Sequence, residues 1–157
     1  MSVIELTIAL GVFLIVVTAM YTLFAVVQRT TVRQDKRNEV NNDIRLSMER
    51  MSKEIRQATN IYSDSGVSLL HMDTFDNGSA ITVTWRASGT TLTRTMGTTT
   101  STLLTGLTST SIFAYSPSIT GATDVTLTLK ARPAHYSTDP AVIVLTSQVR
   151  LRNRSPS

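Results

Sequence analysis

One segment near the start of the chain is apolar on every side. Residues 6–28 contain no Asp, Glu, Lys, Arg or His. Folded as a helix, they span about 34 Å, which exceeds the hydrocarbon core of a bilayer, about 30 Å. A helix of a soluble core rarely needs an apolar surface all round, so we expect residues 1–28 to form a helix that can cross a membrane. A cleaved secretory signal fits less well, because no Lys or Arg precedes the run and the run is longer than a usual signal core.

The helical pattern continues beyond the apolar segment. Residues 29–59 contain neither Gly nor Pro, so nothing in them breaks a helix. Apolar side chains recur at spacings of four and three, with charged and amide side chains on the other faces, which is the pattern of an amphipathic helix. We therefore predict one helix from residue 2 to about 60, roughly 90 Å long, with its amphipathic part at 29–60. The apolar stripe consists of Val40, Ile44, Met48, Met51 and Ile55, continued by Ala58 and Tyr62.

From Tyr62 onward the period of the pattern changes to two, which indicates β-strands. The segments 67–72, 80–86, 91–96, 111–115, 124–131 and 141–153 are rich in β-branched residues and are bounded by Gly, Pro, Asp, Asn and Ser. The second and third of these flank the short link Ala87-Ser88-Gly89, which predicts a hairpin. Residues 97–106 and 115–124 are expected to be exposed loops.

These patterns predict an α+β fold with a long N-terminal helix and an antiparallel β-sheet head domain at 61–157. One face of the sheet is apolar and needs a cover. The amphipathic half of the helix provides it, so Val40, Ile44, Met48, Met51 and Ile55 are predicted to pack on the sheet. Arg45, Glu49 and Lys53 are expected to be more exposed to water.

Glu5 is a carboxylate within an apolar start. A carboxylate at the centre of a membrane costs about 2.5–3.5 kcal/mol on insertion scales. In one interpretation the N-terminus lies at the membrane surface and Glu5 is hydrated. In the other, Glu5 pairs with an α-amino group, either that of Met1 in its own chain or that of a neighbouring subunit.

The remaining sequence gives little sign of catalysis. The chain has no Cys, which excludes disulfides, zinc–thiolate sites and thiol nucleophiles. His71 and His135 have no companion at metal-ligand spacing, and Asp73, Asp76 and Asn77 fit a solvated turn better than a calcium loop. We predict no enzymatic activity, no metal and no cofactor.

The remaining features of the sequence have ordinary explanations. The net charge of +4 is mild, and the aromatic residues are too scattered to stack bases, so nucleic-acid binding is not expected. The sequons Asn77-Gly78-Ser79 and Asn153-Arg154-Ser155 are short enough to arise by chance. The many Thr and Ser residues suit either O-glycosylation or exposed strands.

The first 28 residues, with Glu5 in an otherwise apolar start, resemble the mature N-terminus of type IV pilins and pseudopilins. DIRLSMERMSKEIRQATNIY at 43–62 is similar to the second half of the long helix in minor pilins and J-type pseudopilins. LLTGLTSTSIFAY and VRLRNR resemble parts of that group's head domain. The chain departs from the family in having Met rather than Phe at position 1, no proline in the first helix, no cysteines and no leader. Glu5 stands where a processed pilin has its glutamate, so the numbering is read as that of a processed chain.

The resemblance implies a structural subunit that polymerises through its N-terminal helix into a type IV pilus or a related secretion pseudopilus. It implies residence in the inner membrane before assembly, processing by a prepilin peptidase, and a homopolymer or a co-polymer with other pilins as the product. Glu5 and the often methylated α-amino group of Met1 would guide assembly. The filament core would contain Ile4, Leu6, Ile8, Leu10, Gly11, Phe13, Leu14 and Val17, with any local unwinding close to Gly11.

One sequence rule disagrees with the resemblance, and one alternative function stays open. Arg29, Arg33, Lys36 and Arg37 follow the apolar segment, and the positive-inside rule alone would place that side in the cytoplasm. The family resemblance places the head domain outside, since a removed basic leader would carry the decisive charges. The alternative function is a monomeric binding domain outside the cytoplasm, for which the helix is only a membrane anchor.

Overall fold

The computed structural model describes residues 2–132 and 142–152. The chain divides into two compact units, residues 1–38 and 39–157, which are described separately below. Helix α1 (Val3–Arg56) supplies the first unit and the beginning of the second. The strands that follow α1 form two antiparallel sheets in the second unit. The predicted α+β class is therefore confirmed.

Helix α1 ends a little earlier than the sequence predicts. Its last turn tightens, because the Ala58 backbone N–H bonds the Ile55 carbonyl oxygen at 3.1 Å. The Thr59 N–H then donates to the Asp73 carbonyl oxygen at 2.9 Å. This bond draws the chain into the short strand β1 (Asn60–Ile61). Pairing with a neighbouring strand thus ends the helix at Arg56, where no Gly or Pro marks the end.

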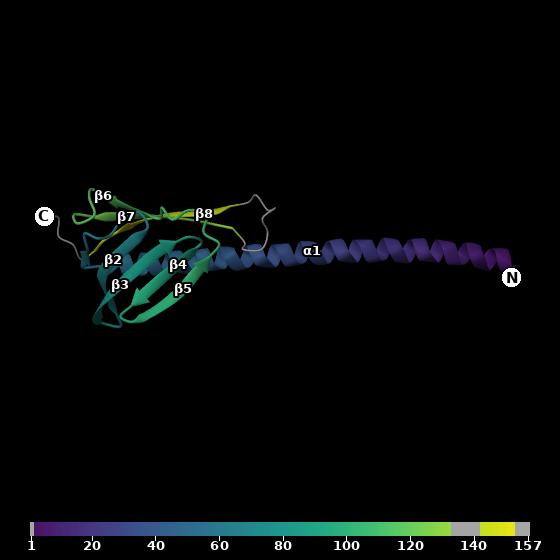
Figure 1. Cartoon of the computed structure of the whole chain (residues 1–157), viewed down its shortest axis with the longest axis horizontal. Helices are drawn as coiled ribbons and strands as arrows, with labels where there is room; N and C mark the ends of the chain where they lie inside the picture. The colour runs from purple at the N-terminus through teal and green to yellow at the C-terminus, as the bar shows by residue number, and fades with distance from the viewer. Residues whose placement is uncertain (1, 133–141, 153–157) are drawn as a thin grey trace. The chain divides into compact units, whose positions relative to one another are not determined.

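The larger sheet has five strands in chain order (Figure 1). The turn between its second and third strands contains Asn77 and Gly78, whose φ angles are 49° and 83°. Positive φ at both central positions matches the twist of the flanking strands, which explains why Asn-Gly forms this hairpin. The strands are β1, β2 (Leu69–Asp76), β3 (Ser79–Ser88), β4 (Thr91–Met96) and β5 (Thr99–Thr105).

The smaller sheet contains β6 (Phe113–Ser116), β7 (Asp124–Ala131) and β8 (Ile143–Arg150), also antiparallel and in chain order. Along β7 the buried residues alternate with more exposed ones. This alternation is the one expected from the period-two pattern of residues 124–131.

Two local expectations were wrong. Residues 97–106 were expected to form a loop, yet they contain β5, which pairs with β4. Most of β5 is exposed, so its sequence shows no apolar alternation, and only its β-branched threonines favour a strand. In the hairpin before it, Ala87 and Ser88 belong to β3 and the turn is at Gly89-Thr90.

A short connection links the two sheets. The Leu107 N–H donates to the carbonyl oxygen of Thr90, in the turn between β3 and β4, at 2.9 Å, and the Thr108 N–H donates to the Lys130 carbonyl oxygen of β7 at 2.9 Å. Gly106 precedes them with a φ of 79°, and its carbonyl oxygen accepts a bond from the Arg132 N–H at 2.8 Å. Residues 106 and 108 therefore bond to the β7 side of the connection, and residue 107 between them bonds to the turn between β3 and β4.

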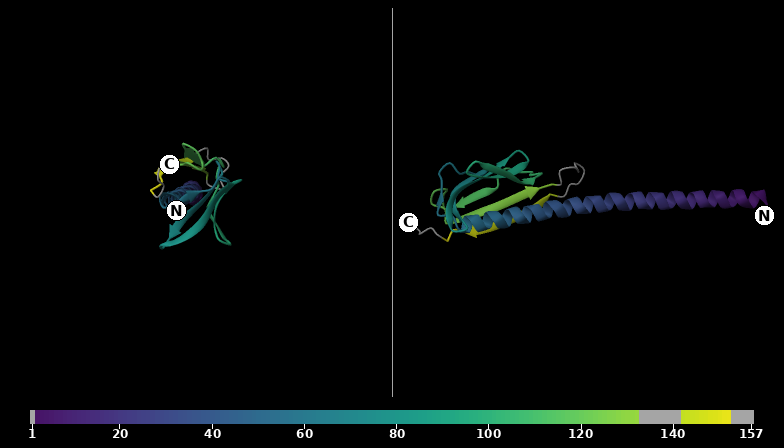
Figure 2. Two further views of the ribbon diagram at one scale, coloured as in Figure 1. Left: turned by 90° about the vertical axis from the view of Figure 1, so that its left-hand side faces the viewer. Right: turned by 90° about the horizontal axis from the view of Figure 1, so that it is seen from below.

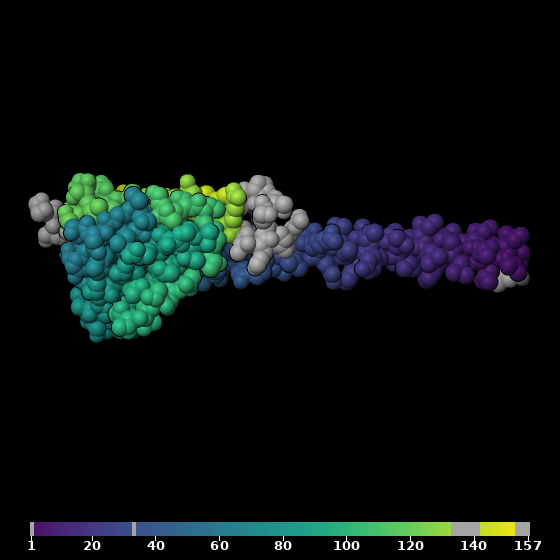
Figure 3. Space-filling model, in the orientation of Figure 1, coloured from purple at the N-terminus to yellow at the C-terminus, as the bar shows by residue number. Residues whose placement is uncertain are grey.

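The core of the second unit is one cluster of buried residues. Ile44, Met51 and Ile55 of α1 are fully buried, as are Trp85 of β3 and Leu127 of β7. The last turns of α1 and both sheets all contribute to this cluster, and the two sheets lie along this part of the helix (Figure 2). The space-filling view shows the strands of the larger sheet packed into a continuous surface (Figure 3).

Candidate functional site

The N-terminus of α1 is closed by its own side chains. The Ser2 N–H donates to Glu5 Oε2 at 2.9 Å, and the Ile4 N–H donates to Ser2 Oγ at 3.4 Å. Ser2 and Glu5 therefore cap the helix in the manner of a capping box: the Glu5 carboxylate accepts from the Ser2 N–H, and the Ser2 hydroxyl oxygen accepts from the Ile4 N–H. This local role for Glu5 was missed, although the Ser-x-x-Glu spacing in Ser2-Val3-Ile4-Glu5 is its known signature. Met1, the other predicted assembly residue, lies outside the described residues.

The first half of α1 presents apolar side chains on all sides. Within the described residues 2–32 of the first unit, all except Ala25 are exposed. In this part of the chain, α1 is the helix long and apolar enough to cross a membrane, by length and composition. The predicted filament-core residues all belong to this surface, and the helix continues without interruption through Gly11. These residues are Ile4, Leu6, Ile8, Leu10, Gly11, Phe13, Leu14 and Val17.

The second half of α1 has one buried face. Ile44, Met51 and Ile55 are fully buried and Met48 is 5% exposed, whereas Val40 is only partly buried against the same cluster. The opposite side is exposed and includes Arg45, Glu49 and Lys53. The stripe therefore lies in the core of the second unit, and Val40 at its N-terminal end lies at the margin.

A buried ionic cluster ties α1 to the larger sheet. Glu54 accepts from Arg94 Nε at 2.9 Å through Oε1, and from Trp85 Nε1 at 2.8 Å through Oε2. Arg50 approaches the same Oε1 at 3.5 Å from one turn earlier in the helix. The side chains of Arg94 and Glu54 are 8% and 10% exposed. The carboxylate is thus fully engaged, and its role is to hold the last turns of α1 at one position against β3 and β4.

The sequence contains a signal for this cluster that we did not use. Arg94 occupies an inward position of its strand, between Leu92 and Met96, where the alternation calls for an apolar side chain. Glu54 directly precedes Ile55 of the buried stripe. A charged residue at an inward strand position and an opposite charge beside a buried helical stripe together suggest a buried ion pair, since an isolated buried charge is too costly.

A second polar cluster lies on the outer side of β1 and β2. The Tyr62 hydroxyl donates to Asp73 Oδ2 at 2.8 Å, and the Thr82 hydroxyl donates to Asp73 Oδ1 at 2.7 Å. The Tyr62 ring stacks on His71 with centroids 4.2 Å apart, and His71 Nδ1 lies 3.0 Å from Asp64. The hydrogen bond to the Asp73 carboxylate, aided by partial desolvation and nearby negative charge, raises the pKa of Tyr62.

This outer cluster does not form a metal site. Within residues 2–132 and 142–152, no three His, Asp, Glu or Cys side chains converge in a way that would hold a metal ion. Asp73 and Asp76 belong to β2, and Asn77 to the turn that follows it, so these three residues form a strand end and a hairpin. His135 and the sequon Asn153-Arg154-Ser155 lie outside the described residues.

Tyr115 connects the two sheets from the side of β6. Its hydroxyl donates to the carbonyl oxygens of Leu69 at 2.9 Å and Gly66 at 3.2 Å. Burial raises the pKa of Tyr115 well above its ordinary value. The hydroxyl therefore stays protonated, and able to donate, in alkaline solution in which an exposed tyrosine would ionise.

No family model, curated protein or solved structure matches this chain.

Proposed function

We propose that the chain is a pilin-like structural subunit, which polymerises through the first half of α1 into an extracellular type IV pilus or a related pseudopilus. The observation that carries this proposal is the apolar surface of residues 6–28, exposed on all sides in the isolated chain. Such a surface needs lipid or other helices around it, because leaving it in water forfeits about 25 cal/mol per Å². The inner membrane provides lipid around this surface before assembly. In the filament, copies of the same helix, or the helices of other pilins, take the place of the lipid.

The second unit fits the role of an exposed head domain. It has its own core, drawn from the end of α1 and from both sheets. Its buried side-chain nitrogen and oxygen atoms within the described residues all have hydrogen-bond partners. The unit therefore needs nothing from the first half of α1 to satisfy its interior, which suits a domain that is carried on a filament and faces water.

One observation favours the second candidate, a monomeric membrane-anchored binding domain. The Glu5 carboxylate already accepts the Ser2 N–H. A carboxylate that caps its own helix has a use without any neighbouring subunit, so its presence at the start of an apolar helix is also compatible with a simple anchor.

Two substitutions at Glu5 separate these functions. Glu5→Gln keeps an oxygen that can accept the Ser2 N–H but removes the charge, whereas Glu5→Ala removes both. If Glu5 pairs with the α-amino group of Met1 on an adjacent subunit, both variants fail, because an unpaired buried charge costs roughly 3–5 kcal/mol. We expect both variants to accumulate as folded protein in the membrane fraction and to yield few or no sheared filaments by electron microscopy.

Asp35→Asn is the matched control, since it removes one negative charge from an exposed position of α1 and should leave the filament yield unchanged. Normal filaments from Glu5→Gln together with a loss in Glu5→Ala would assign Glu5 to capping and reject the pairing role. A native protein that is abundant in the membrane but never forms filaments would reject polymerisation itself in favour of the anchored monomer.

A further inference from the structure

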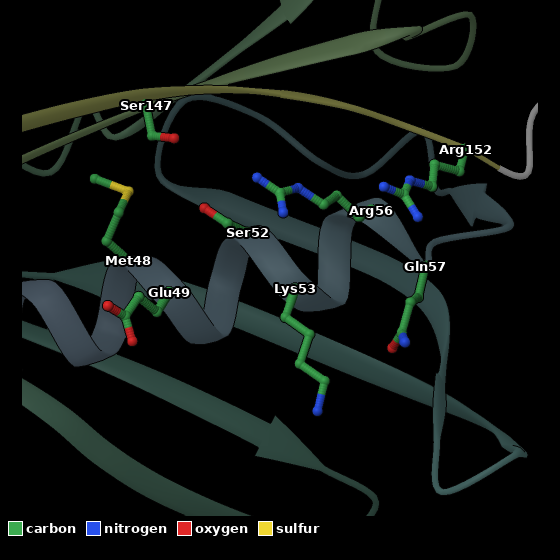
Figure 4. A pocket seen from close by; sticks show the side chains of 8 residues that line it. All are labelled: Met48, Glu49, Ser52, Lys53, Arg56, Gln57, Ser147 and Arg152. Atoms are coloured by element: carbon green, nitrogen blue, oxygen red, sulfur yellow. The ribbon is translucent and has the colours of Figure 1, made fainter.

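A cavity of about 580 Å³ lies in the second unit, beside the last turns of α1 and the end of β8. A cavity of this size is within the range that holds small molecules, about 300–1,000 Å³. Figure 4 shows that Ser52 and Arg56 of α1 and Ser147 of β8 point toward the space between these elements, with Arg152 beside them. The lining also includes Glu49 and Lys53 of α1.

The charge of this cavity is unbalanced. Lys53, Arg56 and Arg152 line it together with only one carboxylate, that of Glu49. Within the described part of the chain, none of the three basic side chains bonds a carboxylate, in contrast to Arg50 and Arg94, which share Glu54. The described lining thus carries more positive than negative side chains, and the guanidinium groups of Arg56 and Arg152 lie on the side of α1 that faces β8 (Figure 4).

A backbone hydrogen bond brings Arg152 next to Arg56. The Arg152 N–H donates to the Arg56 carbonyl oxygen at 3.3 Å, so the chain leaving β8 closes the end of α1. Basic residues in the last turn of a helix are favoured by the helix dipole, which accounts for Lys53 and Arg56. It does not account for Arg152, which comes from the far end of the chain and adds a further positive charge.

We propose that this cavity binds a phosphate monoester. Guanidinium groups present paired N–H donors that match the oxygens of a phosphate, and such charge-assisted bonds are about twice as strong as neutral ones. The hydroxyls of Ser52 and Ser147 supply further donors from the helix and from β8. The remaining volume leaves room for the organic part of the ligand. This inference does not depend on whether the chain polymerises.

The test is an unfolding titration of the full chain in detergent micelles. Trp85 is the one tryptophan of the chain and is fully buried, so its fluorescence reports unfolding of the second unit. A ligand that binds only the folded state raises the midpoint of thermal unfolding in proportion to the logarithm of its concentration. We expect glucose 6-phosphate to raise the midpoint by a few degrees, and glucose or sodium chloride at equal ionic strength to leave it unchanged.

Variants identify the site. In Arg56→Ala/Arg152→Ala the shift should disappear, and in Arg56→Lys/Arg152→Lys it should be reduced, because lysine keeps the charge but not the paired donors. Arg86→Ala/Arg150→Ala removes two exposed arginines outside the cavity and should keep the full shift. An equal shift in all variants, a shift reproduced by sodium chloride, or no shift in the native protein would overturn the proposal. If inorganic phosphate raised the midpoint of thermal unfolding and glucose 6-phosphate did not, the cavity would bind the free anion and not a monoester.

Discussion

At the scale of single residues, the side of α1 on which a residue lies decides its contribution to stability. Ile55 is fully buried, whereas Leu46, on the same helix, is 55% exposed. Both are large aliphatic residues in a regular helix, so replacing each by alanine changes helix propensity little. The difference between the two variants therefore isolates the effect of burial.

We predict that Ile55→Ala lowers the free energy of unfolding by about 2–5 kcal/mol, as expected for a cavity in a packed core. Leu46→Ala should cost less than about 0.5 kcal/mol, because exposed positions tolerate truncation. Chemical denaturation followed by Trp85 fluorescence measures both values. An equal loss in the free energy of unfolding for the two variants would show that burial of the stripe does not stabilise the second unit.

Residue-scale chemistry also marks where sequence reasoning failed. The stripe from Ile44 to Ile55 could be located by its spacing, because apolar side chains at helical intervals usually form a buried face of the helix. The Glu54–Arg94 pair could not be located in the same way, because its partners are separated by forty positions and only the fold brings them together. The capping bonds of Ser2 and Glu5 could have been located from the sequence, because they join residues three positions apart and follow the Ser-x-x-Glu spacing.

At the scale of elements, strands with clear alternation were predicted and an edge strand was not. β7 contributes one face to the core and has a regular pattern. β5 pairs along one side only and is mostly exposed. Its sequence therefore lacks the alternating apolar residues by which a strand is predicted. The short β1 owes its existence to the backbone of β2, which no local pattern encodes.

The connection between the sheets offers a test at this scale. A Cβ atom at Gly106 would collide with the Arg132 carbonyl oxygen, whereas one at Gly78 would meet nothing within 4 Å. The two glycines have nearly the same φ, 79° and 83°, so alanine is strained similarly at both. We predict that Gly78→Ala costs about 1 kcal/mol and Gly106→Ala at least 3 kcal/mol in the free energy of unfolding.

Denaturant unfolding of the two variants under identical conditions measures this difference. Equal losses would mean that the 106–108 connection shifts freely, and that the sheets do not depend on its close backbone packing.

At the scale of the whole molecule, the chain combines an apolar helical segment with a unit that has its own core. We predict that residues 6–28 are shielded from water within the polymer, each helix packed against several copies of itself. The chain has no cysteine, so a single Val17→Cys substitution gives a unique reporter. In sheared filaments this cysteine should react with a water-soluble maleimide at least ten-fold more slowly than an Arg86→Cys control on the exposed face of β3.

Similar reaction rates at the two positions in intact filaments would place this part of the helix in contact with solvent, contrary to the prediction. Dissociation of the same filaments in detergent provides the reference for full reactivity of each cysteine.

The order of the strands has a consequence for how the second unit acquires its structure. In both sheets every strand pairs with its neighbour along the chain, and in the larger sheet two-residue turns join β2 to β3, β3 to β4 and β4 to β5. Folding rates rise as the mean sequence separation of contacting residues falls. The strands β2 to β5 can therefore pair through local hairpins, whereas the contacts of this sheet with α1 join residues far apart in the sequence, such as Glu54 and Arg94.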